Sequence, residues 1–163
     1  MRVTREMLFR HLKDLGIVTT TVNHPAVFTV EEAKTLRGTI IGFHVKNLFL
    51  KDKKGLLWLV ICEEEANIDL KVLPALIGSS RLSFSRPELL REALGVEPGS
   101  VTPFALINDL QNRVEVVLDS RIAKAEAINC HPLENTATTT ISSGDLMKFI
   151  ESTGRVAKFI DFN

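Results

Sequence analysis

Seven consecutive apolar residues, 56–62, place the strongest constraint on the folds open to this sequence. A strand of this composition is apolar on both faces, so it must lie inside a sheet that is covered on both sides. The preceding residues 39–51 also have strand character, and residues 52–55 between the two segments are typical of a hairpin loop. A tight hairpin beside a buried strand excludes a purely parallel, doubly wound sheet.

Helices and strands interleave along the rest of the sequence. Helical spacing of apolar residues predicts helices over residues 4–15, 70–77, 85–94, 120–127 and 143–152. Asp69 is the expected cap of the second of these helices and Ser85 that of the third. A capping box of Thr29 and Glu32 predicts one more short helix. Further strands are predicted over residues 17–22, which are rich in β-branched residues, and over residues 81–84, 113–118, 136–141 and 155–162.

This order of elements predicts a mixed α/β (α+β) fold class. We expect a curved, barrel-like, mixed and mostly antiparallel sheet with helices packed outside. The sequence contains no repeat, low-complexity segment or linker. Residues 1–163 are therefore predicted to form a single domain.

The charges of the sequence balance, with 20 Lys and Arg against 20 Asp and Glu. Phosphate neutralisation dominates general nucleic-acid binding, so DNA binding is disfavoured and any RNA contact is expected to be local. No stretch reaches the roughly 20 apolar residues of a membrane span, and the first residues lack the apolar core of a signal peptide. Cys62 and Cys130 form no CxxC pair. We expect a cytoplasmic protein without membrane contact.

Common cofactor and nucleophile motifs are absent from the sequence. It has no GxxxxGK[ST] loop, no GxGxxG, no HExxH and no GxSxG. Its four histidines, at positions 11, 24, 44 and 131, are widely scattered. We therefore expect no cofactor and no metal site.

The first candidate functional segment is the strand that contains Lys46 and Asn47. Strand alternation puts Lys46 on one face together with Leu48 and Leu50. A lysine in that position either extends past the leucines to solvent or reaches into a pocket to meet an anion. Asparagine is depleted in strands, so Asn47 indicates a bulge or a specific hydrogen bond.

The second candidate segment is the loop of residues 98–103. Two prolines, the second of them Pro103, stiffen a loop that contains Gly99 and Ser100. Glycine can present bare backbone N–H and C=O groups to a ligand, which would discriminate ligands by size. An ordinary turn is the alternative reading.

The third candidate segment begins at His131, whose ring direction is fixed because the following residue is a proline. Asn135 and Thr136 add donors and acceptors just beyond it. His131 could bind or polarise a substrate near neutral pH, or be a structural histidine bonded to a carbonyl. His24 also precedes a proline, and for it we favour a rim or structural role.

Taken in sequence order, these segments resemble the YbaK and prolyl-tRNA-synthetase-associated editing domains, most closely the stand-alone alanyl-tRNA(Pro) deacylases. The resemblance covers essentially the whole sequence. It rests on His24-Pro25-Ala26, Lys46-Asn47-Leu48, the GxxxP pattern from Gly99 to Pro103, and His131-Pro132-Leu133.

The resemblance implies a barrel-like sheet and a pocket that hydrolyses the ester at the acceptor end of a mischarged prolyl tRNA, without metal or cofactor. It implies that Lys46 holds the backbone or phosphate of the terminal nucleotide. It also implies that Gly99 places backbone groups beside the ester and that His131 seats the substrate. The implied substrate-binding residues are Asn47, Ser100, Pro103, Asn135, Thr136 and His24.

Alanine is the expected target amino acid. Asn47 stands where the cysteinyl-specific branch of the family more often has a small hydroxyl residue, which favours Ala-tRNA(Pro) over Cys-tRNA(Pro). Prolyl-tRNA synthetase is an optional second partner. A non-catalytic module that binds tRNA or a synthetase remains an open alternative.

Overall fold

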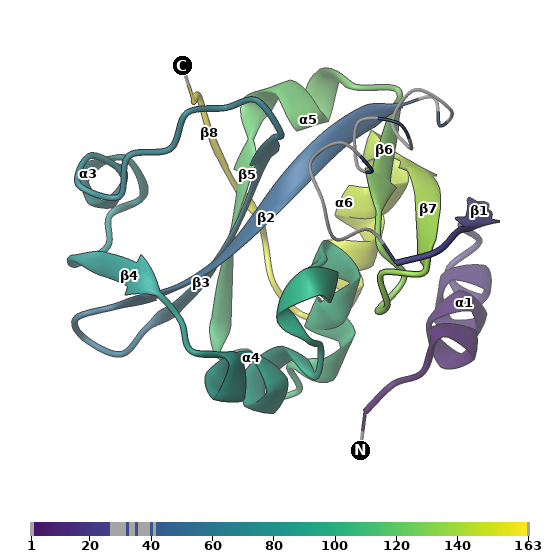
Figure 1. The fold of residues 1–163 in the computed structure, drawn as a ribbon, viewed down its shortest axis with the longest axis horizontal. Helices are drawn as coiled ribbons and strands as arrows, with labels where there is room; N and C mark the ends of the chain where they lie inside the picture. Colours follow the sequence, from purple (N-terminus) through teal and green to yellow (C-terminus); the bar gives the residue numbers. More distant parts are fainter. Residues whose placement is uncertain (1, 27–31, 33–34, 36–39, 41, 163) are drawn as a thin grey trace.

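The computed structural model describes residues 2–26, 32, 35, 40 and 42–162 of the protein. These residues build an eight-stranded mixed sheet in the order β1-β7-β6-β2-β3-β5-β8, with β4 paired to β2 (Figure 1). The strands are β1 (Thr20–Asn23), β2 (Phe43–Asp52), β3 (Leu57–Glu63), β4 (Leu82–Phe84), β5 (Val114–Asp119), β6 (Ala127–Cys130), β7 (Ala137–Ser142) and β8 (Lys158–Ile160). The helices are α1 (Arg5–Asp14), α3 (Leu73–Ile77), α4 (Pro87–Leu94), α5 (Ser120–Lys124) and α6 (Ser143–Ser152), with 3₁₀ turns η1 (Pro98–Ser100) and η2 (Pro103–Asn108).

The apolar segment that begins at Leu57 forms the central strand β3, as the sequence predicts. It pairs antiparallel with β2 on one side and parallel with β5 on the other. Every residue of β3 is buried except the last, Glu63, which is half-buried. Of the seven strand pairings among the described residues, four are antiparallel and three are parallel, so the expected mixed, mostly antiparallel class is confirmed.

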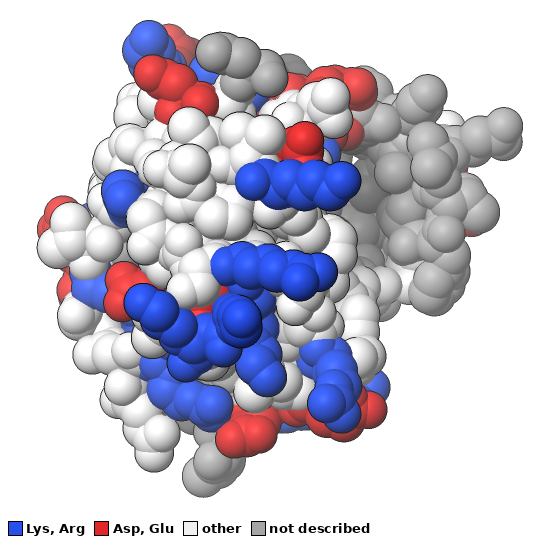
Figure 2. Space-filling model, turned by 90° about the vertical axis from the view of Figure 1, so that its left-hand side faces the viewer, with Lys and Arg blue, Asp and Glu red and all other residues white. Residues whose placement is uncertain are grey.

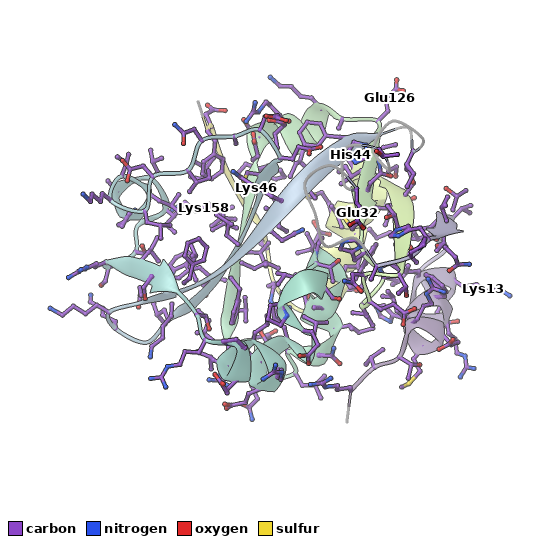
Figure 3. All side chains as sticks on the ribbon, in the orientation of Figure 1. Lys13, Glu32, His44, Lys46, Glu126 and Lys158 are labelled. Carbon is purple, nitrogen blue, oxygen red and sulfur yellow. The ribbon has the colours of Figure 1, made fainter. Side chains whose placement is uncertain are left out.

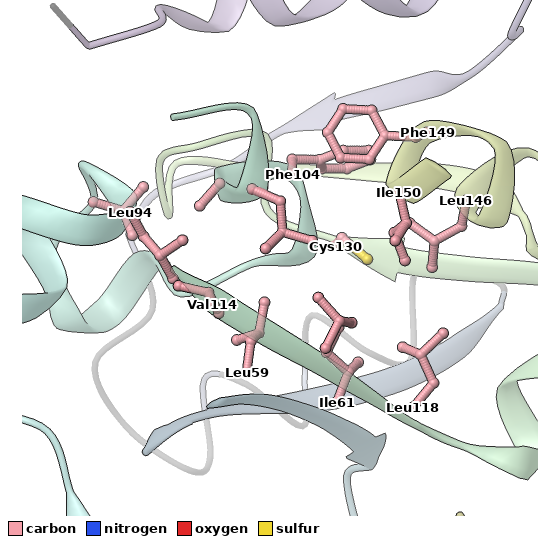
Figure 4. Close-up of a cluster of buried hydrophobic side chains, with 14 of the residues drawn as sticks. Leu59, Ile61, Leu94, Phe104, Val114, Leu118, Cys130, Leu146, Phe149 and Ile150 are labelled. Carbon is pink, nitrogen blue, oxygen red and sulfur yellow. The ribbon is translucent and has the colours of Figure 1, made fainter. Parts of the chain in front are cut away.

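Two hydrophobic cores lie on the two faces of the sheet because the side chains of β3 alternate. Leu59 and Ile61 join the larger core, in which α1, α4, α5 and α6 pack against the sheet (Figure 4). There the rings of Phe104 and Phe149 meet edge to face with centroids 5.3 Å apart. Trp58 and its neighbours on the opposite face join a smaller core under α3. The cores fix β2 and β3 as a rigid platform.

Tertiary pairing and local turns change several predicted boundaries. Residues 127–130 form strand β6 and not the end of a helix, since they pair with both β2 and β7. The helix expected from residue 70 begins at Leu73, because the Asp69 carboxylate accepts from the Lys71 N–H in a preceding turn and does not cap the helix. Ser85 does not cap α4 either. This helix begins at Pro87, and no side chain makes a capping hydrogen bond to it.

Other predicted elements are shorter than expected or only partly described. The first and last predicted strands shrink to β1 and β8. The capping residue Thr29 and residues 39 and 41 lie outside the described residues. Within the described ranges, no helix is long and apolar enough to span a bilayer.

Candidate functional site

The edge of strand β2 that faces away from β3 has no partner among the described strands over residues 45–49. It pairs with β6 only at Phe43 and His44, and with β4 only from Leu50 onward. The Phe49 C=O accepts from the Ser85 N–H at 3.2 Å, so odd-numbered residues of β2 direct their backbone groups away from β3. The N–H and C=O of Asn47 therefore face the gap between β6 and β4, where no described strand pairs with them.

A cavity of about 310 Å³ occupies this opening. Its walls come from β2, β6, β7 and the loop around η1, which are far apart in the sequence. The lining residues are Ile40, His44, Val45, Lys46, Asn47, Glu64, Pro98, Gly99, Val101, Asn129, Cys130, His131 and Thr138. The volume is at the lower end of the range for small-molecule sites.

Lys46 lies on β2 at the cavity and is half-buried (Figure 3). Its ammonium group donates a hydrogen bond to the backbone carbonyl oxygen of Ala66. An ammonium carries three donors, so two remain available to an anionic or carbonyl ligand. Of the two alternatives that the sequence leaves open, this position corresponds to a lysine that lines a pocket.

Asn47 is another residue of β2 that lines the same cavity. Its Oδ1 atom is buried and has no hydrogen-bond partner among the described residues. A buried acceptor without a partner is destabilising by about 1–3 kcal/mol.

Gly99 lies in the 3₁₀ turn η1, which is closed by a 2.8 Å hydrogen bond from the Ser100 N–H to the Glu97 C=O. A Cβ atom at position 99 would lie 3.3 Å from the Asn135 amide nitrogen, a tight contact. Gly99 thus separates the main cavity from a second one, which Ser100 and Asn135 line. The predicted residues around this loop are split between two neighbouring hollows.

His131 lines the main cavity and is held by the backbone. Its Nδ1 lies 2.9 Å from the Ala137 C=O, and a carbonyl can only accept, so Nδ1 carries the proton. Burial lowers the pKa of His131, the Ala137 bond partly offsets this, and nearby His24 lowers the pKa further. The ring is therefore neutral near pH 7, and its Nε2 is an acceptor.

The remaining predicted residues lie around the rim or away from the cavity. The His24 ring lies 6.4 Å from the His131 ring, and its Nε2 is 2.9 Å from the Thr138 hydroxyl. Thr136 is exposed and donates to Glu134 at 3.1 Å. Pro103 is buried at the start of η2 and lines neither cavity.

Sequence reasoning missed several residues of the cavity. Thr138 lies in the threonine-rich strand, which the sequence indicates only as a general source of donors and acceptors. Asn129 belongs to the unpredicted strand β6, and its amide packs against Gly42, where a Cβ would lie 2.8 Å from the amide nitrogen. Burial raises the pKa of the Cys130 thiol to about 12, so this residue is an inert wall. No three His, Cys, Asp or Glu residues of the described ranges could hold a metal ion together.

Comparisons with known proteins identify the family. A model of the aminoacyl-tRNA editing domain matches residues 24–149. The protein is 35% identical over 158 residues to the prolyl-tRNA editing protein ProX of Acetoanaerobium sticklandii, and the match spans 96% of each of the two. It is 38% identical over 161 residues to prolyl-tRNA synthetase associated domain-containing protein 1 of Danio rerio, in a match that spans 98% of this protein and 88% of that one.

A solved structure supports the fold independently of sequence. It is described as a candidate trans-editing enzyme for prolyl tRNA synthetase and matches with a TM-score of 0.71 and 21% identity over 100% of both proteins. At this identity the match bears on the fold alone. The protein therefore belongs to the aminoacyl-tRNA editing domain family, and the enzyme class predicted from its sequence, an aminoacyl-tRNA hydrolase, is confirmed.

Proposed function

We propose that the protein hydrolyses mischarged Ala-tRNA(Pro) in trans, in the cytoplasm, with the aminoacyl ester bound in the main cavity. The observation that carries this proposal is the convergence of Lys46, Asn47, Gly99 and His131 on one small cavity. These residues come from three separate segments of the sequence. The name of the ProX relative, a prolyl-tRNA editing protein, supports prolyl tRNA as the carrier.

The chemistry required of this cavity is modest. An aminoacyl ester is already reactive, so the enzyme needs to orient it and to stabilise the charge that develops on the tetrahedral intermediate. Lys46, anchored through Ala66, has two free donors for the backbone or phosphate of the terminal nucleotide. Gly99 has no side chain to block the approach of its backbone groups to the ester, and His131 seats the substrate.

The need for a second site supports alanine as the target. A synthetase pocket built for proline cannot reject the smaller alanine strongly, since missing methylenes change binding by only about 1–3 kcal/mol. A second site that accepts alanine and excludes proline supplies the missing discrimination. Val45, Val101 and Cys130 supply apolar walls of the cavity in which this discrimination would take place.

A basic strip at the end of β2 that pairs with β4 suits the acceptor end of tRNA. We define it as Lys51, Lys53, Lys54 and Arg81, all exposed and without an ion pair among the described residues. Pairing of β2 with β4, and the Lys53 N–H bond to the Arg81 C=O, hold them together. Figure 2 shows Lys and Arg gathered on this face. Lys51 lies about 17 Å along β2 from Lys46, a span of several phosphates.

The basic strip has its own test. Replacing Lys51 and Arg81 by Gln is expected to raise KM for the charged tRNA and to reduce the slope of log(kcat/KM) against log salt by about two. The matched control is replacement of Lys13, on α1, by Gln. An unchanged salt slope in the double variant would exclude the strip as an RNA contact.

The direct test of function is deacylation of three charged tRNAs. Purified protein is incubated with Ala-tRNA(Pro), Cys-tRNA(Pro) and Pro-tRNA(Pro), and the remaining ester is measured against time without protein. We expect rapid loss of the alanyl ester and survival of the prolyl ester. Loss of the cysteinyl ester alone would assign the other substrate, and survival of all three would favour a binding module. Addition of prolyl-tRNA synthetase tests whether that partner increases turnover.

A further inference from the structure

The cavity contains a hydroxyl whose role depends on a histidine outside it. Thr138 lines the cavity and is 7% exposed. The His24 Nδ1 lies 2.8 Å from the Pro25 C=O, so this nitrogen carries a proton and donates it to the carbonyl. In the neutral ring Nε2 then has only a lone pair, and it accepts from the Thr138 hydroxyl at 2.9 Å.

This arrangement fixes the direction of the Thr138 hydroxyl. With its proton directed to His24, the Thr138 Oγ1 can offer only lone pairs to any other group. Thr138 therefore acts as a hydrogen-bond acceptor toward a ligand in the cavity, although a free threonine hydroxyl can do both.

One more group on the cavity wall is also an acceptor. The Nδ1 proton of His131 is used by the Ala137 C=O, which leaves Nε2 as an acceptor in the neutral ring. The His131 ring lies 6.4 Å from the ring of His24, which bonds Thr138, so the two acceptors belong to the same part of the cavity.

We propose that Thr138 Oγ1 and His131 Nε2 form an acceptor subsite for the α-ammonium group of the aminoacyl ester, with His24 as the residue that orients Thr138. A primary ammonium offers three N–H donors and no acceptor, so it can donate to both groups at once. A hydroxyl offers only one donor and would leave one of the two acceptors unsatisfied. This inference rests on the proposed deacylase function, because it names the part of the substrate that the cavity recognises.

The first experiment removes the ammonium from the substrate. Lactyl-tRNA(Pro) has the shape of alanyl-tRNA(Pro) but carries a hydroxyl in place of the ammonium. Each enzymatic rate is divided by the spontaneous hydrolysis rate of the same ester. We expect kcat/KM to favour the alanyl ester by about tenfold or more, as for a hydrogen-bonded charged group. Equal corrected values for the two esters would overturn the proposal.

The second experiment changes the protein. Thr138→Val removes the acceptor at nearly constant shape, and we expect about a tenfold rise in KM for the alanyl ester with the lactyl ester changed less than about twofold. Thr138→Ser keeps the hydroxyl and should restore the preference. Thr139→Val is the matched control, because Thr139 is also buried on β7 but its hydroxyl bonds Thr21. A preference that survives Thr138→Val would overturn the proposal.

His24→Phe tests the positioning role, since it leaves Thr138 in place but frees its hydroxyl to rotate. We expect the preference for the alanyl ester to fall by a smaller factor than in Thr138→Val. An unchanged preference would remove His24 from the subsite.

Calorimetry with uncleavable ligands separates this inference from the proposed function. Alanylamido-adenosine and lactylamido-adenosine need no turnover to report binding. Tighter binding of the alanyl compound, lost in Thr138→Val, supports the subsite even if no ester is hydrolysed. Equal binding of the two compounds overturns the subsite even if the deacylase assay succeeds.

Discussion

The two ends of β2 differ in a way that explains where the site lies. From Leu50 onward the strand is paired on both edges, by β3 and β4, and the Leu50 side chain joins the smaller core. At Asn47 the edge away from β3 has no paired strand in the described structure, and the cavity beside it has both polar and apolar walls. One strand thus supplies stability at one end and an open edge at the other.

The comparison supports the proposal that ligand binds where the hydrogen bonding of the sheet is incomplete. Unpaired backbone groups and an unpaired amide oxygen are destabilising in the free protein. The fully paired β3 and its two cores offset this loss. Substitutions at the two ends should therefore separate into effects on stability and effects on activity.

The largest effect is expected from Leu59→Ala in the paired region. Leu59 is fully buried in the larger core, so the free energy of unfolding should fall by about 2–5 kcal/mol. Denaturant unfolding measures this loss. The kcat/KM of the folded fraction should stay within about twofold of the parent protein, since Leu59 does not line the cavity. A large loss of kcat/KM with little loss of stability would contradict the division.

Lys46→Ala at the open end should have the opposite signature. Loss of its free donors is expected to lower kcat/KM by about 100-fold, while Tm changes little. Deacylation kinetics and thermal unfolding are measured on the same sample. Lys13→Ala, on α1 and outside the lining of the cavity, is the control and should keep the activity. Equal losses in both variants would argue against a specific role for Lys46.

Asn47→Leu should lower activity and raise stability. The change removes a buried oxygen that has no described partner, so the free energy of unfolding should rise by about 1 kcal/mol. The same change removes a polar contact to the substrate, so kcat/KM should fall about tenfold. If Asn47→Leu destabilises the protein, then Asn47 is structural.

The smallest effect concerns the pH dependence of stability. The folded pKa of His131 is lowered by burial, so below its ordinary value of 6.5 the unfolded protein binds more protons than the folded protein. The free energy of unfolding should therefore fall as pH decreases from 6.5 toward the folded pKa. His131→Gln should remove this component, whereas His11→Gln, on α1, should retain it. Urea unfolding at a series of pH values gives the comparison.

Local patterns predicted the elements whose signals are strong. The apolar run ending at Cys62 predicted the central strand, and helix α6 (Ser143–Ser152) matches its predicted limits. Strand β6 was missed because it is only four residues long and is stabilised by pairing with β2 and β7, which are distant in sequence. Single-sequence patterns contain no information about such pairing.

The candidate site shows the same difference between residues that local patterns identify and residues that only the fold brings into place. Local features singled out Lys46 on a strand face with leucines, Gly99 in a loop stiffened by prolines, and His131 before a proline. All three line one cavity. Thr138 breaks no rule, since threonine is common in strands. Its place beside His24 depends on the register between β1 and β7, which only the folded structure provides.

The most direct test of this account is a crystal structure with uncleavable alanylamido-adenosine bound. We expect the aminoacyl group between the unpaired edge of β2 at Asn47 and the η1 turn, in contact with Gly99 and His131. The adenosine should lie toward Lys46. A ligand bound elsewhere, with the edge of β2 untouched, would contradict the claim that the incomplete part of the sheet is the site of hydrolysis.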